Sequence, residues 1–304
     1  LPSVWCRDDS AVRIDRRHQK RNIVSCYRKP SNQINEGGNV AKRAVVVIPT
    51  YNEYHNIRPL VDRIFALSLP LDLFFVDDAS PDGTGRLLDE ICASLPCSRV
   101  LHRAGKLGLG TAYREAYRIL LKEDYSHFLQ MDADLSHRPE DIGRLMQSAK
   151  EADLVIGSRY CVGGGSQNWP LARRMLSQTA NSTSGGLLGL AVKDSTAGFR
   201  CYRRAVLESL NVIDIRANGY AFQIEMAYYS QYMGFRILEI PIIFDARKYA
   251  KSKMSYQEIS GAAATLARLS AQRLFGPRNL RPPSARRAGR VVLRAKLTDP
   301  EQRC

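Results

Sequence analysis

Two aspartates spaced two residues apart, Asp132 and Asp134, directly follow an apolar stretch that ends at Met131. In an α/β protein, ligands collect at the carboxyl ends of the strands. Two carboxylates at such an edge repel each other unless a cation lies between them, and a hard divalent ion prefers oxygen ligands. The pair therefore predicts a metal site that also holds a diphosphate, with Ser136 as a further ligand or water contact. His137 lies one residue off this alternation, so we expect it on the surface.

Further polar residues follow the other apolar runs. In the segment from Pro49 to Glu53, Tyr51 is suited to packing against a nucleobase or ribose, and Glu53 to accepting hydrogen bonds from ribose hydroxyls. Asp78 follows the next run and is suited to a base or ribose contact. Lys106 lies in a glycine-rich segment, where it would meet a diphosphate. The same residue types are also common where a helix begins, either as caps or in a glycine-rich entry. Each of these positions can therefore be a ligand contact or a structural part of a helix start.

Cationic side chains gather later in the chain, within residues 157–160, 196–200 and 247–253. Arginine grips a phosphate through two parallel hydrogen bonds, whereas lysine offers a point charge. Each segment alone is typical of a solvated face. Together with Arg173 they indicate a second anion site, separate from the one at the paired aspartates.

The elements that must position these residues alternate regularly over the first half of the chain. Apolar runs at 44–48, 73–76, 98–101, 127–131 and 153–157 predict strands, and segments with helical spacing separate them. This alternation predicts an α/β fold with a parallel sheet and helices on both faces. Beyond it we expect a helix near 170–190 and an amphipathic helix near 220–233. Pro241 interrupts a strand over 236–244, which predicts an edge strand.

The net charge of +15 lies at the two ends of the chain. Residues 1–43 hold 10 Lys/Arg against 4 Asp/Glu, residues 268–304 hold 10 against 2, and the body between them is nearly neutral. A nucleic-acid-binding module would carry its charge on the folded body, so this class is disfavoured. We predict a basic disordered extension over 1–43, a catalytic domain over 44–256, and an amphipathic basic helix with a disordered Arg-rich tail over 257–304.

The composition also bears on the cellular compartment. The longest uncharged run, 175–192, is interspersed with Ser, Thr, Gln and Asn, so we expect no membrane span, and the first residues lack a signal-peptide pattern. The 7 cysteines show no zinc-ligand spacing, which favours a reducing compartment.

The order of the motifs gives a more specific indication. The chain reads Val-Ile-Pro-Thr-Tyr-Asn-Glu, Val-Asp-Asp-Ala-Ser, Met-Asp-Ala-Asp-Leu-Ser-His-Arg-Pro-Glu, Ile-Gly-Ser-Arg-Tyr, Asp-Ser-Thr-Ala-Gly-Phe-Arg, Gly-Tyr-Ala-Phe-Gln-Ile-Glu and Ser-Lys-Met-Ser. Over about residues 44–256 it resembles the dolichol/polyprenol-phosphate mannosyltransferases, inverting members of glycosyltransferase family 2 with a Rossmann-like GT-A fold.

The resemblance implies a role for each matching residue. The expected substrates are GDP-mannose and a polyprenyl or dolichyl phosphate, and the expected cofactor is Mg²⁺ or Mn²⁺. The nucleotide-sugar site would comprise Pro49, Tyr51, Glu53 and Asp78, and Lys106 joins this set because of its place in the glycine-rich segment. The metal ligands would be Asp132, Asp134 and Ser136. The acceptor phosphate and a closing loop would involve Arg159, Arg173, Ser177, Arg200, Arg247 and Lys253. Among these, the catalytic set would be Asp132, Asp134, Arg159 and Arg173.

The chemistry agrees with these roles. A phosphate monoester is mostly dianionic at neutral pH, so it attacks without a general base. A lipid acceptor implies a peripheral protein on the cytoplasmic face of a membrane, held there by the 258–275 helix and the Arg-rich end. Two enzymatic alternatives stay open: another sugar nucleotide such as UDP-glucose, and a hydroxyl acceptor. The second would need a base, for which Gln223 and Glu225 are candidates.

Overall fold

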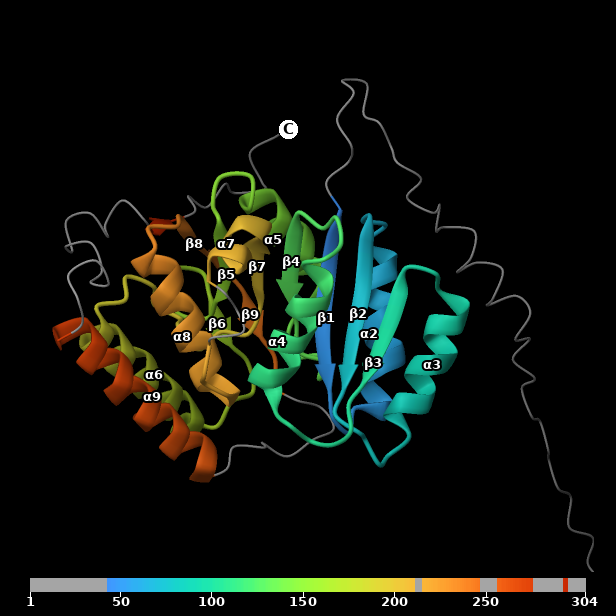
Figure 1. The fold of residues 1–304 in the computed structure, drawn as a ribbon, viewed down its shortest axis with the longest axis horizontal. Coiled ribbons are helices and arrows are strands. Elements are labelled where there is room, and N and C mark those ends of the chain that lie inside the picture. Colours follow the sequence, from blue (N-terminus) through green and yellow to red (C-terminus); the bar gives the residue numbers. More distant parts are fainter. Residues whose placement is uncertain (1–42, 211–214, 247–255, 276–291, 295–304) are drawn as a thin grey trace, which may run out of the picture.

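The computed structural model describes residues 43–210, 215–246, 256–275 and 292–294 (Figure 1). Its centre is a sheet of eight strands in the order β10-β8-β5-β7-β4-β1-β2-β3. These strands are β1 (Ala44–Thr50), β2 (Leu71–Asp77), β3 (Ser98–His102), β4 (His127–Gln130), β5 (Leu154–Ser158), β7 (Arg200–Arg203), β8 (Ile237–Pro241) and β10 (Val292–Arg294). Two short strands, β6 (Gly165–Ser166) and β9 (Ile243–Phe244), pair separately.

Helices cover both faces of this sheet. One face packs against α2 (Tyr54–Ala66), α3 (Thr84–Ser94), the 3₁₀ turn η1 (Pro139–Asp141) and α5 (Ile142–Ser148). The other packs against α4 (Leu109–Leu120), α7 (Arg204–Ser209) and α8 (Gly219–Tyr232). Two longer helices, α6 (Leu171–Leu188) and α9 (Tyr256–Phe275), lie side by side outside α8 (Figure 1).

The strand residues explain why both faces are covered. Along β1, Val45 and Val47 belong to the core under α4 and α8, while Val46 and Ile48 belong to the core under α2 and α5. A strand buried on both faces reads as a continuous apolar run, which is the pattern of a sheet covered by helices on both sides. The predicted α/β fold with a mostly parallel sheet is therefore confirmed.

Two predictions about the second half of the chain were wrong, and one strand was missed. First, β7 was not predicted, and it runs antiparallel between β4 and β5. Second, the strand expected over 236–244 is not at the edge, because β10 pairs with β8 from Ile237 to Glu239. Third, α8 is not amphipathic: most of its circumference is buried because it lies between the sheet, α4 and α9. In each case tertiary contacts override the local pattern.

The C-terminal helix is part of the folded body. Its Leu269 is fully buried, and its two arginines are engaged with neighbouring elements. Arg268 forms an ion pair with Glu225 at 2.6 Å, and Arg273 donates to the carbonyl of Leu187 at 2.8 Å. The two arginines of the predicted amphipathic basic helix therefore contact neighbouring elements of the folded body. The predicted extension over 1–42 and most of the Arg-rich tail lie outside the described residues; Arg43 itself pairs with Asp72.

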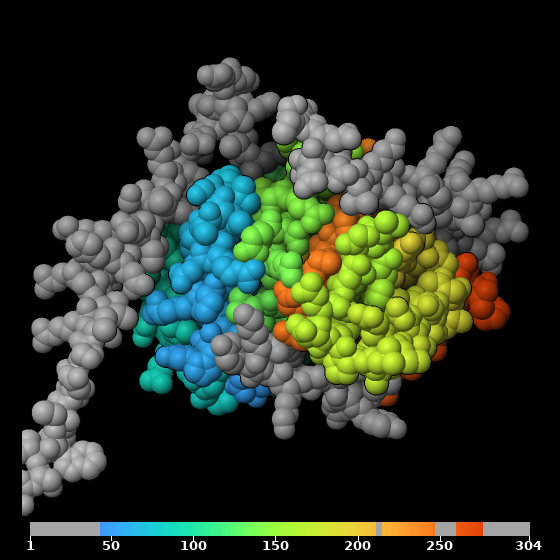
Figure 2. Space-filling view, turned by 180° about the vertical axis from the view of Figure 1, so that it is seen from behind, coloured from blue at the N-terminus to red at the C-terminus, as the bar shows by residue number. Residues whose placement is uncertain are grey.

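None of the helices within the described ranges is long and apolar enough to cross a lipid bilayer. Seen from the opposite side, α6 lies at the molecular surface with α9 at its outer edge (Figure 2).

Candidate active site

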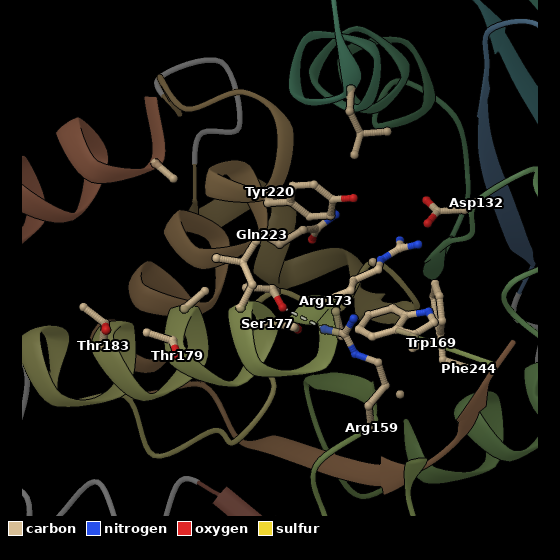
Figure 3. A pocket seen from close by; sticks show the side chains of 18 of the residues that line it. Asp132, Arg159, Trp169, Arg173, Ser177, Thr179, Thr183, Tyr220, Gln223 and Phe244 are labelled. Atoms are coloured by element: carbon tan, nitrogen blue, oxygen red, sulfur yellow. Dashed lines mark hydrogen bonds between the residues drawn. The ribbon is translucent and has the colours of Figure 1, made fainter. Parts of the chain in front are cut away.

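Two cavities meet at the carboxyl ends of the central strands, and Asp132 lines both of them. The smaller cavity, of about 180 Å³, is bordered by the segments that follow β1, β2 and β4. The larger cavity, of about 310 Å³, extends from Asp132 to the seam between α6 and α9 (Figure 3). Leu109 and Tyr220 also line both cavities, so the two form neighbouring compartments of one site.

The segment after β1 supplies one wall of the smaller cavity. Asn52 adopts a left-handed conformation with φ of 58°, which turns the chain sharply between the strand and α2. Its amide donates to Ser80, and the amide of Glu53 donates to Thr84, so the loops after β1 and β2 hold each other. Tyr51 and Glu53 are thereby placed on the cavity wall, as the sequence predicted for a nucleotide contact.

Asp78 organises the opposite wall. One carboxylate oxygen accepts from the buried Arg103 at 2.5 Å, and the other accepts from the amides of Leu107 and Gly108 at 3.1 and 3.0 Å. Gly108 has a φ of 94°, a conformation that favours glycine and lets both amides converge on one oxygen. Asp78 thus fixes the loop that carries Lys106, whose ammonium lies 4.4 Å from the centre of the Tyr51 ring.

The loop after β4 holds the two aspartates. Asp132 has a side chain that is 27% exposed and lines both cavities, while Asp134 is almost buried and lines the smaller one. Leu135 turns the chain with a φ of 62°, and the amide of Ser136 donates back to Asp134 at 3.0 Å. Both carboxylates are therefore presented at the end of a central strand, where the sequence predicted them.

His137 was expected on the surface, and that expectation was wrong. The residue is 1% exposed, stacks on Phe199 and contacts Phe244 edge-on. Its Nδ1 accepts a hydrogen bond from the amide of Asp132 at 3.1 Å, which requires that nitrogen to be unprotonated. Burial lowers the pKa of His137, and the neighbouring Asp132 opposes this only in part. A neutral ring therefore supports the backbone of the first aspartate.

Asp132 and Asp134 would hold a hard cation only if a bound ligand supplies further oxygen atoms to it. Within the described ranges, no group of three or more His, Cys, Asp or Glu side chains is arranged to hold a metal ion. Asp132 and Asp134 offer oxygen atoms beside a cavity, which matches a divalent ion that takes its other oxygens from a diphosphate and water. Ser136 lines neither cavity; its hydroxyl is buried and has no hydrogen-bond partner among the described residues.

Arg159 lines the larger cavity but is already paired. Its guanidinium binds Asp194 through two hydrogen bonds of 2.8 and 2.6 Å and also donates to Thr196 at 2.7 Å. Burial opposes the charge on this group, yet Asp194 raises the pKa of the Arg159 guanidinium above its ordinary value. The pair is buried on both sides, so Asp194 neutralises much of the field that Arg159 would direct at a ligand.

Arg173 differs from Arg159 in having no carboxylate within ion-pair distance among the described residues. It stacks on Trp169, with its guanidinium carbon 4.5 Å from the ring centre, and points across the cavity toward Asp132 (Figure 3). Ser177 lies one helical turn further along α6 and lines the same cavity. A half-buried cation that stacks on an aromatic ring and faces the cavity is available to bind an anion there.

Arg200 faces neither cavity, contrary to its predicted contact with the acceptor phosphate. Its side chain is fully buried and lines neither cavity. It donates to the backbone carbonyls of Ser195, Ala197 and Gln223, and so ties the loop before β7 to α8. The other two predicted loop cations, Arg247 and Lys253, lie outside the described residues.

The two candidate bases of a hydroxyl-acceptor enzyme are also placed. Glu225 is fully buried, accepts from the amides of Arg216 and Ala217, and pairs with Arg268. Its carboxylate is therefore engaged in holding α9 to the body. Gln223 lines the larger cavity, but an amide does not act as a base.

Sequence reasoning missed the residues that join α6 to the rest of the site. The amide of Asn181 donates to Thr196, and its carbonyl oxygen accepts from Ser195. Ser184 contacts Ser195 at 2.8 Å. Polar residues on the buried face of α6 were the available signal, but the partner segment could not be read from that helix alone.

Comparisons with known proteins show the family of the chain. The family model described as Glycosyl transferase family 2 matches residues 45–210. The chain belongs to glycosyltransferase family 2, and within it to the polyprenyl-phosphate mannosyltransferases. It is 43% identical over 228 residues to the polyprenol monophosphomannose synthase of Mycolicibacterium smegmatis, covering 74% of this chain and 86% of that protein. It is 41% identical over 226 residues to the undecaprenyl-phosphate mannosyltransferase of Micrococcus luteus, covering 74% and 93%.

A solved structure supports the fold independently. A glucosyl-3-phosphoglycerate synthase from Mycobacterium tuberculosis, crystallised with Mn²⁺, UDP and phosphoglyceric acid, superposes with a TM-score of 0.54 at 19% identity. The match covers 76% of this chain and 79% of that one. The likeness is one of fold, which is the GT-A type predicted from the sequence.

Proposed function

We propose that this protein transfers mannose from GDP-mannose to a polyprenyl or dolichyl phosphate, with inversion at the anomeric carbon. The observation that carries the proposal is the larger cavity. It joins Asp132, an apolar seam between α6 and α9, and Arg173, which has no carboxylate partner among the described residues. A polyprenyl phosphate combines an anionic group with a long hydrocarbon chain. The anion matches the cation in this cavity, and the hydrocarbon matches the apolar seam. The similarity to two polyprenyl-phosphate mannosyltransferases supports the same substrates.

The donor would occupy the smaller cavity. Tyr51 would pack against the nucleoside, Glu53 would accept from ribose hydroxyls, and Lys106 would approach the diphosphate. Asp78 acts on the donor through the loop that it fixes, since both its oxygens already accept hydrogen bonds. Pro49 is the penultimate residue of β1, the strand that brings Tyr51 to the wall.

Asp132 and Asp134 would hold a divalent cation, Mg²⁺ or Mn²⁺, together with diphosphate oxygens. When bound, such an ion stabilises the negative charge that develops on a leaving diphosphate. His137 would keep the Asp132 backbone in place without contributing charge, because its ring is neutral.

The acceptor phosphate would bind beside Arg173 and Ser177, with Arg159 as a partly neutralised neighbour. One phosphate oxygen forms a bond to the anomeric carbon while the bond from that carbon to the GDP oxygen breaks on the opposite side. No proton has to move, because the phosphate is already dianionic. This agrees with the arrangement around the larger cavity, where Glu225 is committed to other partners and Gln223 is an amide.

The hydrocarbon chain would leave along α6 and α9, and these helices would lie against the cytoplasmic face of a membrane. Small or apolar residues from both helices line that end of the cavity: Leu176, Ala180, Ala262, Ala263 and Leu266. Large apolar side chains also face outward on both helices: Leu171, Met175, Leu187, Leu274 and Phe275. An amphipathic surface of this kind binds at the boundary between headgroups and acyl chains.

A labelled-donor assay tests this function. The protein is incubated with GDP-[¹⁴C]mannose, Mg²⁺ and polyprenyl phosphate, and radioactivity is counted in the organic phase. We expect label to transfer only when lipid, metal and protein are all present, and UDP-[¹⁴C]glucose to give little transfer. Efficient transfer from UDP-glucose and none from GDP-mannose would contradict the proposal.

A further inference from the structure

Gln223 carries a buried amide that the proposed roles leave unused. The residue is 1% exposed, and neither its Oε1 nor its Nε2 has a hydrogen-bond partner in the described part of the protein. A buried polar group without a partner destabilises the folded state, so native proteins retain few of them. Because this amide also lines the larger cavity, a bound molecule is the natural source of its missing partners.

The backbone holds this amide at the junction of the two cavities. Gln223 lies one helical turn after Tyr220, which lines both cavities, and the two side chains project from α8 on the same side (Figure 3). The carbonyl of Gln223 accepts from the buried Arg200 at 2.9 Å, which fixes this turn of the helix. The amide therefore lies beside Tyr220 on the wall of the larger cavity, which Asp132 and Arg173 also line (Figure 3).

The chemistry of an amide narrows the choice of ligand. Its oxygen needs a hydrogen-bond donor and its nitrogen needs an acceptor. A dianionic phosphate and a metal-bound diphosphate only accept, so they leave the amide oxygen unsatisfied. A sugar hydroxyl does both.

We propose that Gln223 binds a hydroxyl group of the transferred hexose and thereby makes the site selective for the sugar. This inference rests on the proposed function for the identity of the hexose. Sites built to hydrogen-bond a hydroxyl reject analogues that lack it far more strongly than apolar pockets reject an extra group.

A second glutamine provides a matched control. Gln130 on β4 is also fully buried, and both its amide atoms lack a partner among the described residues. However, it lines neither cavity. Replacing either residue with Met removes an unsatisfied amide at nearly constant volume, but only Gln223→Met removes one that a donor sugar can reach.

The test compares the affinity for GDP with that for GDP-mannose by calorimetry, with Mg²⁺, in wild type, Gln223→Met and Gln130→Met. We expect Gln223→Met to bind GDP as the wild type does but GDP-mannose about tenfold to a hundredfold more weakly. Gln130→Met should retain the wild-type ratio of the two affinities. A series of GDP-deoxymannoses identifies the hydroxyl: one analogue should bind weakly to wild type and lose nothing further in Gln223→Met.

Equal losses for GDP and GDP-mannose, or no change in either, would overturn the inference. If Gln223→Met does not fold, Gln223→Asn replaces it, since shortening the side chain withdraws the amide while keeping its polarity; an unchanged ratio of affinities would then reject the role. If wild type uses UDP-glucose instead of GDP-mannose, the proposed function fails. The same comparison between UDP and UDP-glucose then still decides whether Gln223 contacts the sugar.

Discussion

The donor and acceptor sides of this site are built in different ways. On the donor side the key acid, Asp78, is satisfied in advance by Arg103 and two backbone amides. On the acceptor side the two arginines differ from each other: Arg159 is neutralised by Asp194, while Arg173 lies on Trp169 without a carboxylate partner among the described residues. The proposed donor side is thus held in place by internal hydrogen bonds, whereas the proposed acceptor side keeps one cation available for an incoming anion.

The largest effect should come from the residue shared by both sides. We expect Asp132→Ala to lower the transfer rate by about 10³-fold, because a metal ion contributes several kcal/mol to the stabilisation of the leaving group. Initial rates across a Mg²⁺ and Mn²⁺ titration measure this. An unchanged unfolding temperature is the control for folding. Wild-type rates in the variant would show that Asp132 does not support the transfer reaction.

Arg159 should matter mainly for stability. Arg159→Ala leaves the fully buried Asp194 without its partner, and breaking such a pair costs about 3–5 kcal/mol. Urea unfolding measures the loss. The double variant Arg159→Ala/Asp194→Ala should recover part of it, because the uncompensated carboxylate is also removed. A single variant as stable as wild type would show that the pair does not hold this part of the fold.

Arg173 should matter mainly for the acceptor. We expect Arg173→Ala to raise the KM for polyprenyl phosphate about tenfold to a hundredfold, since a hydrogen bond to a charged group contributes about 1.5–3 kcal/mol. The KM for GDP-mannose and the unfolding temperature should change little. Arg173→Lys should recover part of the acceptor affinity through its point charge. Equal increases in both KM values would place Arg173 on the donor as well.

The outward apolar residues of α9 should hold the protein to lipid. Leu274 is 64% exposed and Phe275 is 83% exposed. Replacing both with Ser should weaken binding to phospholipid vesicles by about tenfold or more, since a buried large apolar side chain contributes about 1.5–3 kcal/mol. Tyr54→Ser on α2, on the opposite side of the molecule, is the matched control (Figure 1). Equal vesicle binding by both variants would contradict this orientation.

The smallest effect should be a pH dependence of stability. Burial alone would raise the pKa of Asp194, but Arg159 lowers it below the ordinary value for an aspartate. The pair therefore stabilises the fold fully above the unfolded-state pKa of about 3.9, and this contribution is lost as the pH falls below that value. The free energy of unfolding should fall less steeply with acid in Asp194→Asn than in wild type. Parallel slopes between pH 5 and pH 3 would contradict the pairing.

The sequence predicted the positions of residues around the smaller cavity better than those around the larger one. Asp132 and Asp134 follow a strand directly, and Tyr51 and Glu53 follow another, so local order places them at one sheet edge. The acceptor side depends on contacts between distant segments. No local pattern pairs Arg159 with Asp194, 35 residues later, or inserts β7 antiparallel between β4 and β5.

Single residues were also misplaced because their positions depend on contacts and backbone turns that a local pattern does not show. Arg200 follows a glycine-containing turn and carries a charge, which resembles a phosphate contact, yet its donors are used by backbone carbonyls. His137 was assigned from strand alternation, but the left-handed Leu135 changes the direction of the loop and buries the ring. Gln223 lies in a motif that can be recognised in the sequence. Only the structure shows that its amide is buried without a hydrogen-bond partner among the described residues, and this indicates what the amide can bind.

The central claim is that a phosphate, held beside Arg173, attacks a sugar whose leaving group is held beside Asp132. The most direct test supplies GDP-mannose with polyprenyl phosphate or with the corresponding polyprenol and determines the product linkage by NMR. We expect a β-linked mannosyl phosphate from polyprenyl phosphate and no product from polyprenol. Transfer to polyprenol, or an α-linked product, would contradict it.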